Sequence, residues 1–207
     1  MQQYLDVIRR VLESGHRKSN RTGVDTLSTF NVNYQIDLRS GFPLLTTKEI
    51  SWKNIVVENL WFLSGDTRID LLRKHGCRFW EPWADENGLV PSAYGNFWRN
   101  FPVHKDGEAA FNDQIRYVVD ELKARPESRR LVVSAWAPGN AQTSALPPCH
   151  AFWVLNVQQD EHGEPLLCLH LTQRSCDVAL GLPYNIAGYA FLLELISRFT
   201  GIRAGYF

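Results

Sequence analysis

The fold of this chain is decided by the run Leu146-Pro147-Pro148-Cys149-His150, which leads directly into the apolar stretch Ala151-Phe152-Trp153-Val154-Leu155. Two consecutive prolines fix the backbone φ angle and remove two hydrogen-bond donors, so they end regular structure. The stretch that follows is rich in aromatic and β-branched residues, which predicts a strand over residues 151–157. The run therefore predicts a thiol held in a defined direction at the start of a strand.

Further strands and helices are expected on both sides of this strand. Strand-like composition recurs at 131–136 and 166–171, and loose alternation of apolar and polar residues predicts another strand over 27–38. Apolar residues at helical spacing predict helices over 4–12, 55–63, 113–123 and 181–200. Residues 79–101 are crowded with aromatic side chains and are expected to form a packed loop region. Because helices do not strictly alternate with strands, we expect one α/β (α+β) domain over residues 1–207.

Composition excludes several classes of function. The 22 basic residues balance the 22 acidic ones, so no overall field draws the chain to nucleic acid or to an anionic membrane. No apolar stretch approaches membrane-spanning length, and the N-terminus has no export pattern. The four cysteines and six histidines lack metal-ligand spacing, so no metal is expected. Free thiols without an export signal predict the cytoplasm.

Two carboxylates and one thiol are the first candidates for chemistry. Most free cysteines are small buried hydrophobic residues, so Cys149 alone favours a structural role. Glu58 lies on an apolar helix, where a carboxylate must be paired, protonated or facing a cavity. A salt-bridged core glutamate and a functional one fit this pattern equally. Asp177 follows an expected strand, at the kind of position where α/β proteins place sites.

Arginines at the ends of expected elements indicate an anion site. Arg21, Arg129, Arg130 and Arg174 come from separate loops, and guanidinium groups gathered in this way hold phosphate through their planar forks of donors. For any one of them the alternative is a solvated surface charge. Asn185, just inside the last helix, is either a first-turn residue or an amide that binds the edge of a pyrimidine.

Taken together, these residues stand in an ordered series of motifs that covers nearly the whole chain and resembles the thymidylate synthase family. The matching runs are Asn20-Arg21-Thr22-Gly23, Gly41-Phe42-Pro43-Leu44-Leu45-Thr46-Thr47-Lys48, Glu58 with Leu60-Trp61-Phe62-Leu63, Trp83-Ala84-Asp85-Glu86-Asn87-Gly88, Tyr94-Gly95, Ser128-Arg129-Arg130, Pro147-Pro148-Cys149-His150, Gln173-Arg174-Ser175-Cys176-Asp177 and Gly181-Leu182-Pro183-Tyr184-Asn185-Ile186-Ala187. Each run is ambiguous alone, whereas the set is specific.

The resemblance implies a large twisted mixed sheet flanked by helices, with two subunits packed sheet to sheet. It implies reductive methylation of dUMP to dTMP by 5,10-methylenetetrahydrofolate through addition of the Cys149 thiolate to C6. Glu58 is expected to handle proton transfers, with support from Tyr94. The phosphate is expected to bind Arg21, Arg174 and Ser175, with Arg129 and Arg130 reaching in from the partner subunit.

The resemblance also assigns the remaining contacts. Asn185 is expected to bind the uracil, with His150 beside the substrate. Trp80 and Trp83 are expected to pack near the folate, and Asp177 to hold its pterin. These are the candidate cofactor-binding residues, and no metal is implied.

Several positions depart from the family pattern. Val57 and Asn59 flank Glu58 where His and Leu are expected, Ser92-Ala93 precedes Tyr94 where Pro-Val is common, and Gly188 stands where Ser is usual. These changes leave open a pyrimidine nucleotide 5-hydroxymethylase, with Asn185 favouring uracil over cytosine. The sequence stops at Phe207, before an expected His-x-Tyr segment that binds deoxyribose. A truncated homologue that binds nucleotide without turnover is therefore a third hypothesis.

Overall fold

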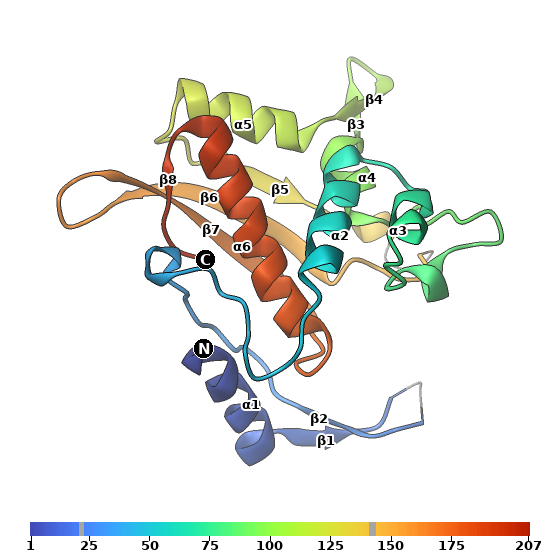
Figure 1. Cartoon of the computed structure of the whole chain (residues 1–207). Coiled ribbons are helices and arrows are strands. Elements are labelled where there is room, and N and C mark those ends of the chain that lie inside the picture. The colour runs from blue at the N-terminus through green and yellow to red at the C-terminus, as the bar shows by residue number, and fades with distance from the viewer. Residues whose placement is uncertain (21–22, 141–143) are drawn as a thin grey trace.

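The structure is a computed structural model, and it describes residues 1–20, 23–140 and 144–207 (Figure 1). Its main sheet has the strand order β5-β6-β7-β8. The four strands are β5 (Val132–Ser134), β6 (His150–Gln159), β7 (Pro165–Gln173) and β8 (Arg203–Ala204). Strands β5, β6 and β7 are antiparallel, whereas β8 runs parallel to β7. The expected mixed sheet and α/β class are confirmed, as are the strands expected over 131–136, 151–157 and 166–171.

The β6–β7 register positions the candidate thiol. His150 lies opposite Gln173 in the ladder, so Cys149 comes level with Arg174 at the edge of the sheet. Along β6 the side chains of Trp153 and Leu155 are fully buried, whereas Phe152, which precedes Trp153, is 37% exposed. This alternation follows from the two-residue period of a strand, and it leaves one face of β6 partly uncovered.

Helix α6 (Gly181–Thr200) crosses one face of the sheet and carries much of the core (Figure 1). Ile186, Ala190 and Leu193 are fully buried, and their spacing places them on one helical face. Gly201 ends the helix in the left-handed region at φ 77°, which suits a residue without Cβ. Helix α2 (Trp52–Ser64) contacts α6 and is capped by the Ser51 hydroxyl, which accepts the Asn54 N–H.

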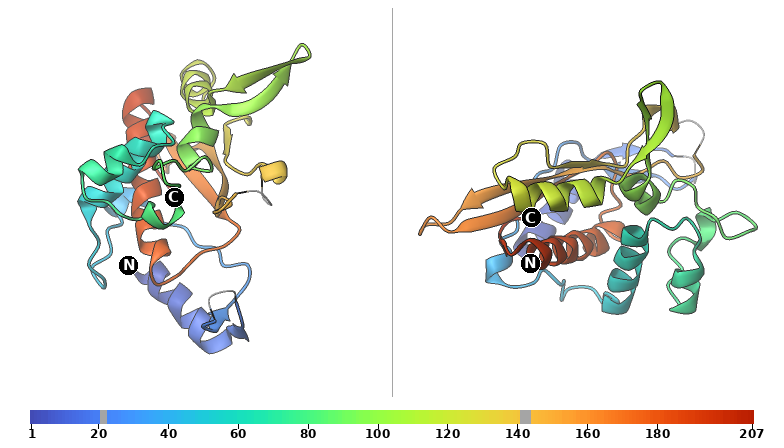
Figure 2. Two further views of the ribbon diagram at one scale, coloured as in Figure 1. Left: turned by 90° about the vertical axis from the view of Figure 1, so that its right-hand side faces the viewer. Right: turned by 90° about the horizontal axis from the view of Figure 1, so that it is seen from above.

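The other elements surround this pair of helices and the sheet. They are α1 (Gln2–Ser14), α3 (Asp70–Lys74), α4 (Tyr94–Arg99), α5 (Gln114–Ala124), the short turns η1 (Leu38–Ser40), η2 (Glu81–Trp83) and η3 (Pro138–Asn140), and the hairpins β1 (His16–Lys18) with β2 (Thr26–Ser28) and β3 (Phe101–Lys105) with β4 (Glu108–Asn112). The β3–β4 hairpin projects away from the sheet (Figure 2). The four helices expected from sequence are confirmed.

The prediction of a strand over residues 27–38 is wrong. Only β2 is a strand there, Asn31 has a positive φ of 59°, and Phe30 is 90% exposed. The left-handed residue breaks the extended backbone. The end of the run nevertheless makes sheet-like hydrogen bonds, since Ile36 and Phe207 exchange their backbone N–H and C=O groups at 2.6 and 2.9 Å.

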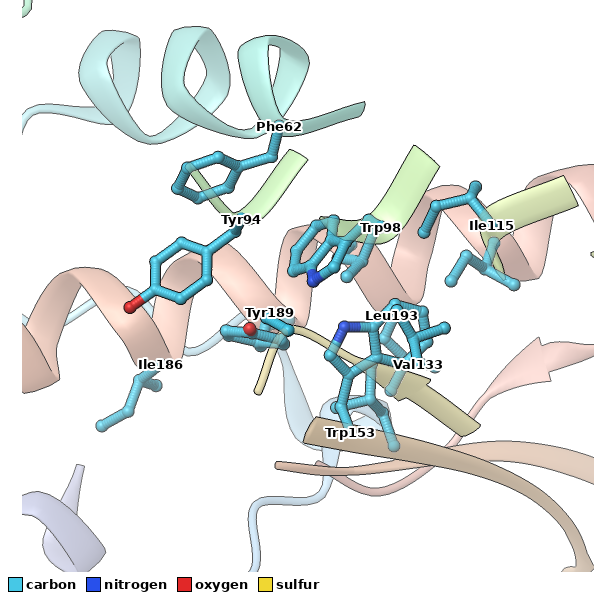
Figure 3. Close-up of a cluster of buried hydrophobic side chains, with 14 of the residues drawn as sticks. Phe62, Tyr94, Trp98, Ile115, Val133, Trp153, Ile186, Tyr189 and Leu193 are labelled. Atoms are coloured by element: carbon cyan, nitrogen blue, oxygen red, sulfur yellow. The ribbon is translucent and has the colours of Figure 1, made fainter. Parts of the chain in front are cut away.

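One aromatic cluster joins the helices to the sheet. Figure 3 shows Phe62 of α2 above Tyr94 of α4, with Trp98, Tyr189 and Trp153 beneath. The Phe62 and Tyr94 rings meet edge to face at 5.2 Å, which is a favourable arrangement for aromatic pairs. The same core extends to α1 and α5, and its continuity supports the expectation of one domain over residues 1–207. Helix α4, inside the region expected to be loop, is one of the elements that the sequence did not reveal, together with α3, β1, β8 and the β3–β4 hairpin.

Close approach of α4 to α2 depends on Gly95. A Cβ at Gly95 would lie 2.3 Å from the carbonyl oxygen of Phe62, which is backbone and cannot rotate away. We expect Gly95→Ala to lower the free energy of unfolding by about 1–3 kcal/mol, measured by urea denaturation, because the two helices must separate. Gly139→Ala is the control, since its Cβ would meet nothing within 4 Å. Equal stability of the two variants would contradict this account.

Candidate active site

The backbone around Cys149 is held by Arg174 from the neighbouring strand end. The backbone N–H of Arg174 donates to the Cys149 carbonyl at 2.9 Å. Its guanidinium donates from Nε to the Pro148 carbonyl at 2.8 Å and from Nη2 to the Pro147 carbonyl at 2.6 Å. A proline-rich turn without free donors is thus fixed through its acceptors, and Cys149 is partly exposed at its end.

A tyrosine hydroxyl contacts the same turn from the other side. The Oη of Tyr94, the first residue of α4, accepts the backbone N–H of Cys149 at 3.1 Å and of His150 at 3.4 Å. Burial, and next the nearby Cys149 charge, raise the pKa of Tyr94 above its ordinary value. Tyr94 therefore keeps its proton, and that proton remains to be donated to a bound molecule.

Glu58 is a carboxyl group with a raised pKa, and its charge acts on Tyr94. Trp80 Nε1 donates to Glu58 Oε1 at 2.7 Å, and Trp80 is itself only 7% exposed. Burial raises the pKa of Glu58 to about 7, while the Trp80 hydrogen bond opposes the rise. No salt bridge to Glu58 occurs among the described residues, so of the two interpretations open at the sequence level the salt-bridged one is not observed. A carboxyl group near neutrality can give or take a proton at physiological pH.

His150 is neutral and is fixed by two tyrosines. Its ring stacks on Tyr94 with centroids 4.5 Å apart, and its Nδ1 lies 3.1 Å from the hydroxyl of Tyr189. Burial lowers the pKa of His150 to about 4, against a hydrogen bond with Asn185. The imidazole therefore acts here as a neutral hydrogen-bonding group.

Asn185 lies in the first turns of α6, where it faces the end of β7. Its Oδ1 accepts from Gln173 Nε2 at 3.0 Å, and the thiol of Cys176 lies 4.0 Å from the same oxygen. The Gln173 contact fixes which end of the carboxamide is the acceptor. Together with the His150 hydrogen bond, it orients the amide at the sheet edge that carries Cys149.

Asp177 shapes the entry to α6. Its Oδ1 accepts the backbone N–H groups of Ala179 at 2.9 Å and Leu180 at 2.8 Å, and its carbonyl accepts those of Gly181 and Leu182. The residue is exposed, and Oδ2 has no hydrogen bond to any described residue. One carboxylate oxygen thus builds the turn, and the other is open for a ligand.

The arginines expected at the site divide into two groups. Arg174 and the exposed Ser175 lie beside Cys149. Arg129 and Arg130 are exposed in the loop before β5, and the β5–β6 register brings Arg130 level with Asn156. That position is on the order of 20 Å along β6 from Cys149, at about 3.3 Å per residue. Arg21 lies outside the described residues.

The two tryptophans expected at the folate lie on one segment. Trp80 packs against Trp61 and Phe62 in the core, with ring centroids 5.3 and 5.8 Å apart. Trp83, at the end of η2, is partly buried against the same cluster. Phe79, between Cys77 and Trp80, is 39% exposed and contacts Tyr184 of α6 edge to face. The segment therefore presents aromatic surface between α2 and α6.

Sequence reasoning did not single out Tyr189, Gln173 or Trp136. Tyr189 stands four residues after Asn185 in an expected helix, and that spacing already places both on one face. The guanidinium carbon of Arg174 lies 5.4 Å from the centre of the Trp136 ring, a cation–π contact. No sequence pattern links those two residues, because they meet only through the pairing of β5, β6 and β7.

No group of three metal-ligating side chains is found in the part of the chain that the structure describes. Nor does any described helix have the length and apolarity needed to cross a bilayer.

Comparison with known proteins accounts for this arrangement. Residues 2–207 match the family model for thymidylate synthase. A thymidylate synthase of Haloferax volcanii is 46% identical over 221 residues, which cover 98% of this chain and 63% of that protein. The chain thus spans less than two thirds of that relative's length, and it belongs to the thymidylate synthase family.

Proposed function

We propose that the protein converts dUMP to dTMP with 5,10-methylenetetrahydrofolate as one-carbon and hydride donor. One observation carries the proposal: Tyr94 Oη accepts the backbone N–H groups of Cys149 and His150, and the pKa of Tyr94 is raised mainly by burial and in part by Glu58, a carboxyl group whose own pKa is about 7. Tyr94 thus links a thiol that can act as nucleophile, a hydroxyl that can donate a proton and a carboxyl group that titrates near neutrality. The family relationship supports the choice of substrates.

Each step of the proposed reaction is assigned to a residue of the candidate site. The Cys149 thiolate adds to C6 of the uracil ring, and negative charge then develops over C5 and O4. Asn185 and the neutral His150 offer hydrogen bonds to the ring edge, and Glu58 takes part in proton transfer, including loss of the C5 proton. Tyr94 donates its free proton toward the same region. Arg174 and Ser175 hold the phosphate, with Arg21 assigned to the same role.

The described residues fit a folate. A planar pterin needs apolar faces and an acceptor for its N–H groups, and the segment with Trp80 and Trp83 supplies the first while Asp177 Oδ2 supplies the second. The bound folate supplies the one-carbon unit and the hydride. Trp80 and Trp83 exclude water from the reacting carbon, which favours methylation over hydroxymethylation.

A sheet-to-sheet homodimer is part of the proposal. Val132 of β5 and Phe152 of β6 are 41% and 37% exposed, so apolar side chains lie open on a sheet face. Arg129 and Arg130 lie far along β6 from their own Cys149, as arginines that serve a partner's site would. A second copy is therefore proposed to bring these two guanidinium groups to the phosphate. For the compartment we propose the cytoplasm, because all four cysteines are free thiols.

Product mass tests the reaction. Incubation with dUMP and methylenetetrahydrofolate is expected to give a methylated nucleotide, and Cys149→Ala is expected to abolish the product because no thioether can form. Retained activity in Cys149→Ala would overturn the mechanism. A hydroxymethylated nucleotide would place the chain with the pyrimidine hydroxymethylases, and unchanged dUMP with wild-type protein would favour a nucleotide-binding role without turnover.

The pKa of Glu58 makes both turnover and stability depend on pH. Ionised Glu58 accepts the proton, so kcat is expected to rise through about pH 7, and Glu58→Gln to lower it at least about 100-fold. The folded state raises this pKa above its ordinary value, so the protonated carboxyl stabilises the fold below about pH 4.5. That contribution, about 3 kcal/mol relative to high pH, is lost as the pH rises through about 7. Urea unfolding at several pH values checks this, and Glu58→Gln should lack that slope.

Trp136 is expected to orient Arg174. Replacement by Leu removes the cation–π contact, so KM for dUMP should rise about fivefold while kcat changes little, as measured by steady-state kinetics. Trp136→Phe keeps an aromatic face and serves as the matched control. Equal KM values in the two variants would show that the ring face has no role in phosphate binding.

A further inference from the structure

A buried amide lies in the contact between α2 and α6. Asn59 is 5% exposed, and the other buried residues of α2 are apolar: Ile55, Val57, Trp61 and Phe62. A buried carboxamide costs free energy unless it is hydrogen-bonded, and asparagine is a weak helix former. Its Nδ2 donates to the Ile55 carbonyl at 2.9 Å, one turn earlier in the same helix. This bond holds the side chain in one orientation without satisfying its full hydrogen-bonding capacity.

Gly188 of α6 provides the space into which this amide points. A Cβ built at Gly188 would lie 3.1 Å from Asn59 Nδ2, and no other non-local atom lies within 4 Å of it. That distance is tighter than ordinary van der Waals contact, so any side chain at 188 would force Asn59 to move by a few tenths of an ångström. The two residues therefore fit each other as a pair, with a long polar side chain on one helix and none on the other.

Both members of the pair adjoin candidate active-site residues. Asn59 directly follows Glu58, and Gly188 stands three residues after Asn185, close to the same face of α6. The pair thus adjoins a carboxyl group along α2 and the proposed base-binding amide along α6. A sub-ångström slide of α2 along α6 would alter the spacing of those two groups, and catalytic geometry tolerates only about 0.5 Å.

We infer that Asn59 is a positioning residue whose carboxamide, seated against Gly188, fixes the register of α2 on α6 and thereby the place of Glu58 relative to Asn185. A single buried polar group is a known device for setting helix register. The inference deepens the proposed function, on which its kinetic readout rests. It also assigns a physical role to two residues that depart from the family pattern.

The test compares three variants with the wild-type protein. Asn59→Leu keeps the shape of the side chain and removes its hydrogen bond. Gly188→Ala adds a methyl group that crowds the Asn59 amide. The double variant Asn59→Ala with Gly188→Ala removes the amide from α2 and places a methyl group on α6 in the space it leaves. Ile55→Val is the matched control, because Ile55 is equally buried on α2 and its side chain has no part in the site. Thermal melting of each variant records the purely structural effect.

Two readouts follow the position of Glu58. The first is the pH titration of Trp80 fluorescence, taken as the difference from Trp80→Phe, because Trp80 donates directly to the Glu58 carboxyl. Cys77, Tyr94 and Tyr189 also interact electrostatically with Glu58, so their titration could change the Trp80 fluorescence as well. The fluorescence transition is therefore assigned to Glu58 only if Glu58→Gln abolishes it. The second readout is kcat and KM for dUMP.

Asn59→Leu and Gly188→Ala are each expected to shift the pH midpoint of the Trp80 fluorescence change by at least about half a pH unit. For Asn59→Leu the shift is expected to be upward, because the surroundings of Glu58 become less polar. Both should lower kcat about tenfold and change KM less than about threefold, and the double variant should recover part of the loss. Ile55→Val should lower the melting temperature alone. The inference is overturned if Asn59→Leu changes midpoint and kcat no more than Ile55→Val does. Absence of dTMP with wild-type protein would contradict the proposed function, while the fluorescence midpoint would still decide the role of Asn59.

Discussion

The site depends on the Tyr94 hydroxyl, which accepts two successive backbone N–H groups, those of Cys149 and His150. A peptide turn after two prolines has few donors, and these two would otherwise need water or a strand partner. The hydroxyl reaches them because Gly95 lets α4 lie against the backbone of Phe62. The backbone of Cys149, the candidate nucleophile, is thus positioned by one helix packed on another, and a substitution in the core that separates these helices would also move this residue.

Electrostatics at this sheet edge come from burial more than from ion pairs. Glu58 has a pKa of about 7 and His150 of about 4, and in both cases burial is the largest cause. Neither residue has an ion-pair partner among the described side chains, so His150 stays neutral at physiological pH while Glu58 titrates there. Arg174 lies beside the same turn and adds hydrogen bonds from its guanidinium to the Pro147 and Pro148 carbonyls.

The sequence predicted best where a pattern was long and bounded. Strands β6 and β7 and helix α6 were predicted because periodic apolar runs stand between proline or glycine residues. Cys149 directly precedes β6, Arg174 directly follows β7, and Asn185 lies in α6. In residues 27–38 apolar and polar residues alternate, but most of the run does not pair with a neighbouring strand. Asn31, which has a positive φ, interrupts the extended backbone there. Helix α4 has only six residues, half of them aromatic, and it packs on α2. Glu58 was marked as a charge that needed an explanation, but Trp80 as its partner follows only from the tertiary fold.

The same reasoning separates residues that local sequence can identify from those that only topology can. Trp136 and Arg174 are distant in sequence and meet because β5, β6 and β7 are neighbours, while Arg129 and Arg130 adjoin β5 yet lie at the far end of β6 from Cys149. A motif therefore indicates which side chains are candidates for the chemistry, and the strand register shows which of them lie at the same end of the sheet. Asn59 and Gly188 extend the argument to helices, because the fit between one amide and one missing side chain appears only when both helices are in place.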